Sequence, residues 1–259
     1  MAKAADKVAV IVKKAVKSPR GAKARAIAAT EPVAAKKRSG KTKKPLAPER
    51  IAEILDALAR TYPGVVCALN HHSAWELVVA TILSAQCTDA RVNLVTPTLF
   101  AAFPTPAAMA SASLPELEEI IRTTGFFRNK SKSIRGAAQA VVAEFGSAVP
   151  QTMDELLRLP GVARKTANVV LGSWYGIAVG VVVDTHVLRL SRRLELTRND
   201  DPVKVEQDLM KIIPQDRWIA FSHELIHHGR QICIARTPRC ADCTLEHLCN
   251  SADKTWSSH

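Results

Sequence analysis

Long apolar runs are absent from this 259-residue sequence. No stretch approaches the roughly 20 consecutive apolar residues that cross a bilayer. The segment AVIVKKAV near the N-terminus is too short and too interrupted for a secretory signal. Strand signals are nearly absent as well, because the only β-like run, GVVVD at 180–184, is one short segment without a partner. These absences argue against a membrane protein and a sheet, and we expect a soluble, intracellular protein of the cytoplasm or nucleoid.

Aromatic residues are also scarce, at 5% of the chain, whereas 47% of the residues are hydrophobic. Most of the apolar residues stand in runs of Leu, Ala and Val, which favour helices. A chain of this length can bury a substantial core. The composition therefore predicts a mostly helical protein of one or two domains.

An excess of acidic charge is missing, and the net charge is +12. All of that excess lies in residues 1–48, which hold 14 Lys and Arg against Asp6 and Glu31, since residues 49–259 hold 22 of each sign. The tail has no aromatic residue and is rich in Ala, Lys, Pro and Ser, so we expect it to be disordered. It is either a solubilising leader or a polycationic arm that binds phosphate groups.

Helix signals recur at short intervals from Pro48 onward. Residues 49–61 carry apolar residues on one face, and residues 75–86 are apolar on most sides and should form a buried helix. Ser113 and Glu116 form a capping box, and a helix over 216–229 should end at its glycine. The predicted architecture is all-α, with a cysteine-rich end.

Four cysteines gather after the last of these helices, with the spacing C-x6-C-x2-C-x5-C. In an intracellular chain such a group indicates a metal site rather than disulfides. Structural zinc usually takes two C-x2-4-C pairs, whereas only one is present, so the spacing favours an iron-sulfur cluster, with zinc as the alternative. The ligands are Cys233, Cys240, Cys243 and Cys249, and Arg230, Arg236 and Arg239 lie near enough in sequence to offset the cluster's charge. The other cysteines, Cys67 and Cys87, are expected to be small buried apolar residues.

The segment HELIH at 223–227 matches the H-E-x-x-H pattern of zinc proteases. The match is short, no third ligand follows at the expected spacing, and the helix runs directly into the cysteine cluster. We therefore reject catalytic zinc and expect His223 and His227 at a helix surface or an interface.

The stretch LPGVARKTANVVL at 159–171 predicts a turn followed by a helix whose first residues are Arg164 and Lys165. Two cations at a helix N-terminus oppose the macrodipole. A helix, this turn and a second helix form a helix-hairpin-helix, whose outward N–H groups can hold a phosphate. An anion there would relieve Arg164, while Lys165 would hold a larger share of free amine, able to attack carbon. From this motif alone, a nucleophile and a phosphate contact are equally good roles for Lys165.

Asp184, in VDTH, follows the apolar run and precedes the helical VLRLSRRL, so it is expected to cap that helix. A carboxylate near a reactive amine also suits glycosidic cleavage, because it stabilises positive charge on the sugar and helps to move protons. The two roles are compatible, and they favour the nucleophile role for Lys165.

These motifs, together with LSAQCTD and the cysteine spacing, resemble the endonuclease III family of DNA glycosylases, over roughly residues 49–252. The resemblance implies a monomeric, bifunctional enzyme that excises oxidised pyrimidines from damaged double-stranded DNA and then nicks the abasic site. Lys165 would form a Schiff base at C1′ of the flipped nucleotide, Asp184 would assist, and β-elimination would follow. The four cysteines would hold a 4Fe-4S cluster.

The resemblance also implies two helical domains that flank a DNA cleft. Residues 68–178 would form a six-helix domain with the hairpin, and residues 49–67 and 179–259 the cluster domain. Gln86 matches the glutamine that fills the gap left by the flipped base, and Phe126 lies where an apolar wedge enters the stack. The full set of expected DNA contacts is Gln86, Phe126, Arg128, Lys130, Gly161, Val162, Ala163, Arg164 and His186.

Three features depart from the family pattern. Ala163 replaces a glycine of the hairpin, the segment between Lys165 and Asp184 is one residue longer, and Phe126-Phe127-Arg128 makes the wedge loop bulkier and more basic. Two alternative functions are an adenine-type monofunctional glycosylase, which lacks the lysine, and a non-catalytic, redox-sensing DNA-binding protein.

Overall fold

A computed structural model describes residues 47–256 of the chain. The basic tail predicted for residues 1–48 lies outside the described residues except for Ala47 and Pro48, which begin the first helix. Within residues 47–256 the secondary structure is helical and contains no strand, so the all-α prediction is confirmed. No helix in this range has the length and apolar character that a membrane crossing requires.

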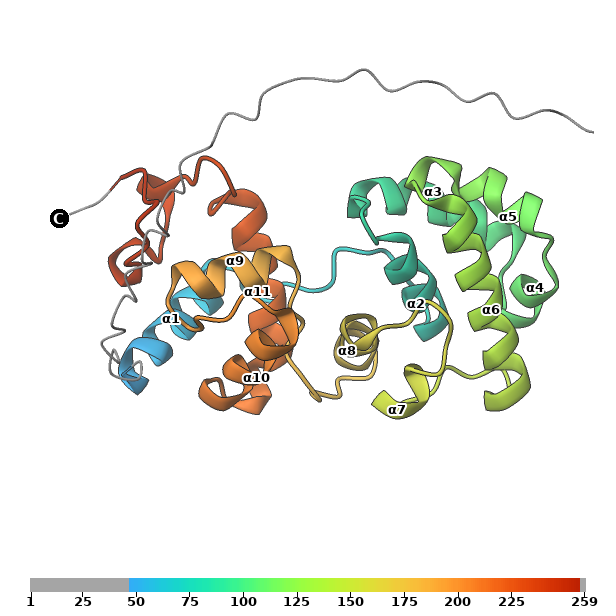
Figure 1. The fold of residues 1–259 in the computed structure, drawn as a ribbon, viewed down its shortest axis with the longest axis horizontal. Helices are drawn as coiled ribbons and strands as arrows, with labels where there is room; N and C mark the ends of the chain where they lie inside the picture. Colours follow the sequence, from blue (N-terminus) through green and yellow to red (C-terminus); the bar gives the residue numbers. More distant parts are fainter. Residues whose placement is uncertain (1–46, 257–259) are drawn as a thin grey trace, which may run out of the picture. The chain divides into compact units, whose positions relative to one another are not determined.

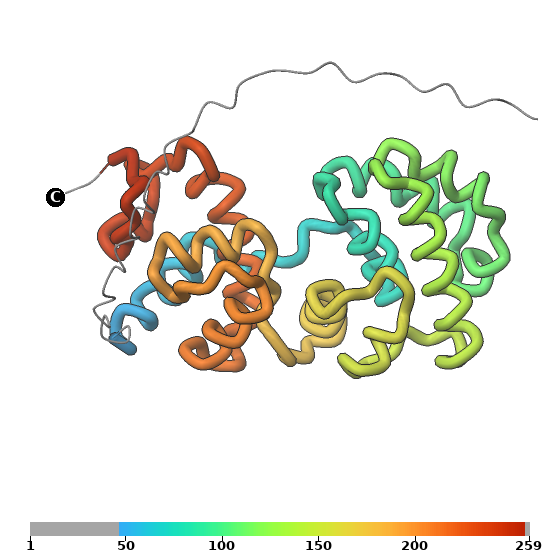
Figure 2. The backbone as a smooth tube through the Cα atoms, viewed as in Figure 1, coloured from blue at the N-terminus to red at the C-terminus, as the bar shows by residue number. Residues whose placement is uncertain are grey.

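The helices form two groups around two hydrophobic cores (Figure 1). The first group is α2 (Ala74–Leu83), α3 (Asp89–Ala102), α4 (Pro106–Ser111), α5 (Leu114–Ile121), η1 (Arg122–Thr124), α6 (Phe127–Phe145), α7 (Met153–Leu156) and α8 (Arg164–Ser173). The second is α1 (Pro48–Thr61), α9 (Thr185–Arg193), α10 (Pro202–Ile212), η2 (Gln215–Arg217), α11 (Trp218–Gln231), η3 (Cys240–Asp242) and η4 (Glu246–Leu248). The chain passes between the groups after α1 and again before α9 (Figure 2).

The most apolar helix of the sequence lies at the centre of the first core. Nine of the ten residues of α2 are buried, and α8 packs against α2. The helix ends at Leu83 rather than continuing to Gln86, because Gln86 takes a left-handed conformation with φ 52°. Few residues other than glycine adopt that conformation. The backbone of Gln86, just after the end of α2, is therefore strained.

The run 180–184, which resembles a strand in sequence, is the extended connector between the two cores. Val182 is buried in the first core, whereas Val181 and Val183 are buried in the second. Successive side chains of an extended segment point to opposite sides. The apolar run therefore needs no partner strand, since both of its faces are covered by helices.

Helix α11 runs through Gly229 to Gln231, so the prediction that Gly229 ends the helix was wrong. The glycine has a packing role instead. A Cβ at Gly229 would lie 2.9 Å from Cβ and from Nδ1 of His186, which is on α9. The absence of a side chain at Gly229 is what lets α9 and α11 approach so closely.

We expect Gly229→Ala to lower the free energy of unfolding by about 1–3 kcal/mol, because the new methyl group overlaps His186. The measurement is urea unfolding followed by circular dichroism. Gly172→Ala is the matched control: it is also helical, but its nearest contact is the Ile219 side chain at 3.2 Å, and the gain in helix propensity of up to about 1 kcal/mol offsets that contact. Equal stability of the two variants would contradict the packing role.

Candidate active site and cysteine centre

The turn before α8 adopts the hairpin geometry that the sequence predicts. Val162 N–H donates to Leu159 O (3.0 Å), and Gly161 takes φ +81°. A Cβ at Gly161 would lie 2.7 Å from Cβ of Ser133, so no other residue fits there. Ala163 is the N-cap of α8 with φ −96° and ψ 171°, an ordinary extended conformation. Its Cβ is therefore accommodated without strain, although a glycine was expected.

The cation at the start of α8 is paired within the protein rather than left for an external anion. Arg164 donates through Nε and Nη2 to Glu206 of α10, at 2.8 and 3.0 Å, and Asn168 donates to the same carboxylate at 2.9 Å. Glu206 is buried, and its hydrogen bonds raise the pKa of the Arg164 guanidinium. A carboxylate near a helix N-terminus is also favoured by the macrodipole. Glu206 thus gives Arg164 an anionic partner within the protein, while 43% of the Arg164 side chain stays exposed.

Lys165 and Asp184 line the same pocket. Lys165 is the exposed second residue of α8. Asp184 caps α9 as predicted, since its Oδ1 alone accepts hydrogen bonds from the backbone N–H groups of His186 and Val187, both at 2.8 Å. The helix start fixes the carboxylate at the end of the 180–184 connector, next to the pocket that Lys165 enters.

The H-E-x-x-H segment does not form a zinc site. Glu224 is buried and pairs with Arg217 at 3.1 Å, while Nε2 of His223 lies 3.1 Å from Ser173 Oγ. Burial lowers the pKa of His223 to about 4. His223 and His227 line the pocket of Lys165 and Asp184, as does Cys67. The two histidines therefore face the pocket of Lys165 and Asp184.

Gln86 and Phe126 lie together at a second pocket of about 240 Å³, which Gly161 also lines. Both have left-handed backbones, with φ 52° and 48°. Phe126 is 63% exposed, so it does not pack in the core as most phenylalanines do. Non-glycine residues strained in this way cluster at functional sites.

Lys130 is not a surface cation, contrary to the expectation of a DNA contact. It is 5% exposed, and its Nζ donates to the carbonyls of Leu83 (2.8 Å) and Thr124 (2.7 Å). Burial lowers the pKa of its ammonium group. Leu83 and Thr124 directly precede the segments that carry Gln86 and Phe126, so Lys130 holds those two segments together from inside.

Two other expected DNA contacts have partners within the protein. Arg128 is exposed and lies over the ring of Phe127, at 5.3 Å from its centroid. His186 is half-buried, with Nδ1 3.2 Å from Nη2 of Arg189, and burial lowers its pKa. Val162 is buried. The other residues expected at the hairpin, Gly161, Ala163 and Arg164, are exposed.

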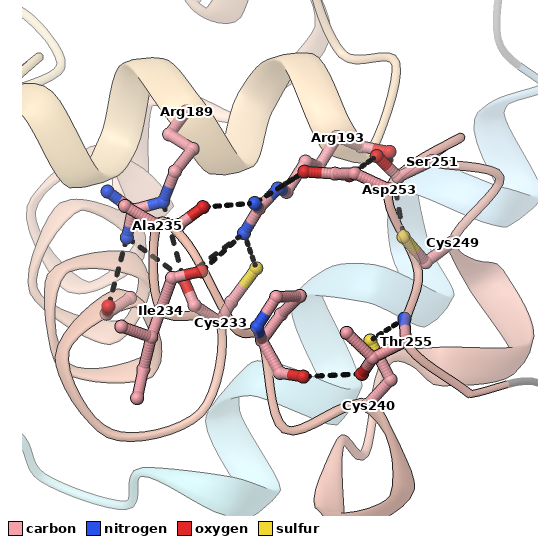
Figure 3. A network of polar contacts seen from close by, with 12 residues as sticks. Arg189, Arg193, Cys233, Ile234, Ala235, Cys240, Cys249, Ser251, Asp253 and Thr255 are labelled. Carbon is pink, nitrogen blue, oxygen red and sulfur yellow. Dashed lines mark hydrogen bonds and ion pairs between the residues drawn. The ribbon is translucent and has the colours of Figure 1, made fainter.

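The four cysteines predicted as ligands form no disulfide and line one cavity. Arg193 of α9 supplies the nearest guanidinium: its Nη1 donates to Cys233 Sγ at 3.1 Å, and Thr255 N–H donates to Cys240 Sγ at 3.4 Å (Figure 3). The sequence analysis assigned this role to Arg230, Arg236 and Arg239, of which Arg239 lines the cavity. Arg230 instead pairs with Asp89 at 2.7 Å, at the pocket of Lys165.

The cavity disfavours an ionised thiol at Cys243. Burial, followed by the charges of the neighbouring cysteines, raises the pKa of the Cys243 thiol to about 11. As they lie, no three His, Cys, Asp or Glu side chains within residues 47–256 are arranged to hold a metal ion. The four cysteines therefore line one cavity without converging on a single point.

Comparisons with known proteins agree with these features. Residues 79–215 match the model of the family described as "HhH-GPD superfamily base excision DNA repair protein". The chain is 57% identical to "Endonuclease III" of Synechocystis sp. (strain ATCC 27184 / PCC 6803 / Kazusa) over 79% of this chain and 93% of that protein. It is 43% identical to the protein of the same name from Bacillus subtilis (strain 168), over 80% and 94%.

Two solved structures share the fold at 43% identity, each over 79% of this chain and 96% of the other. One is described as a non-covalent endonuclease III–DNA complex, with a TM-score of 0.76. The other is a trapped endonuclease III–DNA covalent intermediate, an estranged-adenine complex, with a TM-score of 0.75.

We expect Lys130→Met to lower the free energy of unfolding by about 1–3 kcal/mol, because it leaves the Leu83 and Thr124 carbonyls unpaired. Lys132→Met is the matched control, since Lys132 is exposed on the same helix, and surface changes usually stay within about 0.5 kcal/mol. Chemical unfolding of both variants measures the difference. If Lys132→Met proves as costly as Lys130→Met, the internal hydrogen bonds of Lys130 are not what matters.

Proposed function

The chain belongs to the endonuclease III family, within the HhH-GPD superfamily of base excision DNA repair proteins, and on that premise we propose that Lys165 and Asp184 form its catalytic centre. The function that this centre supports best is that of a bifunctional DNA glycosylase and abasic-site lyase. The observation that carries it is the shared pocket: a lysine at the start of the hairpin's second helix and a carboxylate from the connector. The substrate is damaged double-stranded DNA, and its lesions are oxidised pyrimidines.

In the proposed reaction, the neutral amine of Lys165 attacks C1′ of an extruded nucleotide. The bond between C1′ and the base breaks, and the base leaves with the bonding electrons and a proton. Opening of the sugar ring then gives an imine between C1′ and Nζ. Loss of a proton from C2′ expels the 3′ phosphate and nicks the strand. The covalent intermediate of a relative supports this course.

Asp184 acts on charge and on protons in the same sequence. Its Oδ1 accepts hydrogen bonds from two backbone N–H groups, which fix the position of the carboxylate. An ionised carboxylate beside C1′ stabilises the positive charge that develops on the sugar as the base leaves. Helix capping and catalysis are thus performed by one side chain.

DNA binding is assigned to the exposed backbone of the hairpin, to Gln86 and to Phe126. Their common pocket with Gly161 supports the assignment. Gln86 would fill the space left by the extruded nucleotide, and the exposed Phe126 ring would enter the base stack. Arg128 can reach a phosphate from the same segment, whereas Lys130 serves the fold. A genomic DNA substrate implies work inside the cell, in the cytoplasm or nucleoid.

We also propose that the two hydrophobic cores correspond to two domains and that the cysteines hold a 4Fe-4S cluster in the second. When bound, the cluster supplies a compact cationic core for four thiolates and a group that can exchange electrons. Arg193 holds together the segments next to Cys233. Its guanidinium donates to Cys233 Sγ, to the carbonyls of Ile234 and Ala235, and to Asp253. These contacts fix the loop that carries Cys233 before any substrate arrives.

The catalytic role of Lys165 is tested by borohydride trapping with a duplex that bears one thymine glycol. The wild type should yield a covalent adduct, and Lys165→Gln should lower adduct formation and strand cleavage by about a thousandfold or more, as removal of a nucleophile does. Lys211→Gln is the control, because Lys211 is an exposed lysine of α10. Base release without an adduct in the wild type would make the enzyme monofunctional and reduce Lys165 to a phosphate contact.

The metal assignment is tested by elemental analysis of the purified protein. We expect about four irons and four sulfides per chain. Cys243→Ser should lose most of the iron and the visible absorbance, while Cys87→Ser should keep both, because Cys87 packs against the first core. About one zinc per chain without sulfide would contradict the cluster.

A further inference from the structure

One buried side-chain atom in the pocket of Lys165 and Asp184 has no hydrogen-bond partner. Five side-chain nitrogen or oxygen atoms within residues 47–256 are buried without a hydrogen bond. Of the residues that carry them, only His227 lines this pocket, and its atom is Nε2. Buried polar groups are nearly always hydrogen-bonded, so an exception at a reactive pocket suggests a group that is satisfied by a ligand.

The protonation state of this histidine follows from its other contacts. The backbone of Val66 acts on the pKa of His227 as a hydrogen-bond acceptor does. Since Nε2 has no partner, the nitrogen involved is Nδ1, which donates to the carbonyl. Burial and the neighbouring Arg230 lower the pKa of His227, so the ring is neutral near pH 7. With the proton on Nδ1, Nε2 is an acceptor that awaits a donor.

Outside its base, the extruded nucleotide offers no hydrogen-bond donor to such an acceptor. The phosphates carry only acceptor oxygens, and deoxyribose within a strand has no free hydroxyl group. Thymine, uracil and the lesions that keep their imide carry a donor at N3–H, on the edge that is freed when the base leaves its partner. An acceptor in the base pocket therefore matches that edge.

We propose that Nε2 of His227 accepts a hydrogen bond from N3–H of an extruded thymine- or uracil-type lesion, which makes His227 a specificity-determining residue. This inference rests on the proposed function. Nε2 is shielded in the free protein, so the base enters by opening the pocket. The Asp89–Arg230 ion pair lines that pocket and is partly exposed. Exposed pairs contribute little to stability, so this pair can open at low cost.

The experiment pairs a change in the protein with a change in the substrate. Single-turnover base release is measured for wild type, His227→Leu and His227→Gln, on duplexes with thymine glycol or its N3-methyl derivative, and each rate is divided by the same protein's cleavage rate at a preformed abasic site. Because the abasic site has no base, the ratio isolates recognition of the base. Circular dichroism and unfolding midpoints establish that the variants fold.

For the wild type, N3-methylation should lower the ratio about tenfold, as expected when a site built for a hydrogen bond loses its donor. His227→Leu should show a similar loss with unmodified thymine glycol and little further loss on methylation. His227→Gln should recover part of the ratio, because its amide oxygen can accept.

Equal sensitivity of wild type and His227→Leu to methylation would overturn the inference, because the methyl group would then act by size alone. An unchanged ratio in His227→Leu would also overturn it, while leaving the proposed function intact. Failure of the wild type to cleave the abasic site or to release thymine glycol would instead refute the proposed function.

Discussion

The pairing of Glu206 with Arg164 is the interaction on which the geometry of the pocket depends. Removing a carboxylate from water costs several kcal/mol unless cations and hydrogen bonds replace the solvent, and Glu206 obtains both from Arg164 and Asn168 of α8. Because α10 packs in the second core and α8 in the first, this contact ties the start of α8 to the opposite helix group. Lys165 directly follows Arg164 in the sequence. Its position relative to Asp184 is therefore set by the Arg164–Glu206 pair, which need not contact the substrate.

Much of the fold could be predicted because its determinants are local. The apolar face of α1, the capping box at Ser113 and the N-terminal capping by Asp184 each depend on residues two to four positions apart, and each formed as expected. The grouping of the cysteines is local as well. The pairing of Lys165 with Asp184 in one pocket was accessible through the resemblance of their two motifs to a known family, although nineteen residues separate them.

The contacts that could not be predicted are those between distant segments. Lys130 looks like a surface cation in sequence, and only the fold shows that two carbonyl groups enclose it. The burial of Glu206 could not be predicted, because none of its neighbours in the sequence indicates it. Arg193 was missed at the cysteines for the same reason: forty residues separate it from Cys233. The sequence shows how many charged residues a segment carries. Which of them pair with one another depends on how the helices pack.

The alternation of Val181, Val182 and Val183 between two cores restricts how this chain can change in length. One residue inserted within the connector would turn each valine toward the wrong core and rotate Asp184 away from the pocket. An insertion before it meets no such barrier, since residues 174–180 form a loop with Gly176 at φ +70°. Changes in chain length are therefore confined to the loop at residues 174–180. The number of residues between Lys165 and Asp184 can vary there while the distance between the two side chains stays the same.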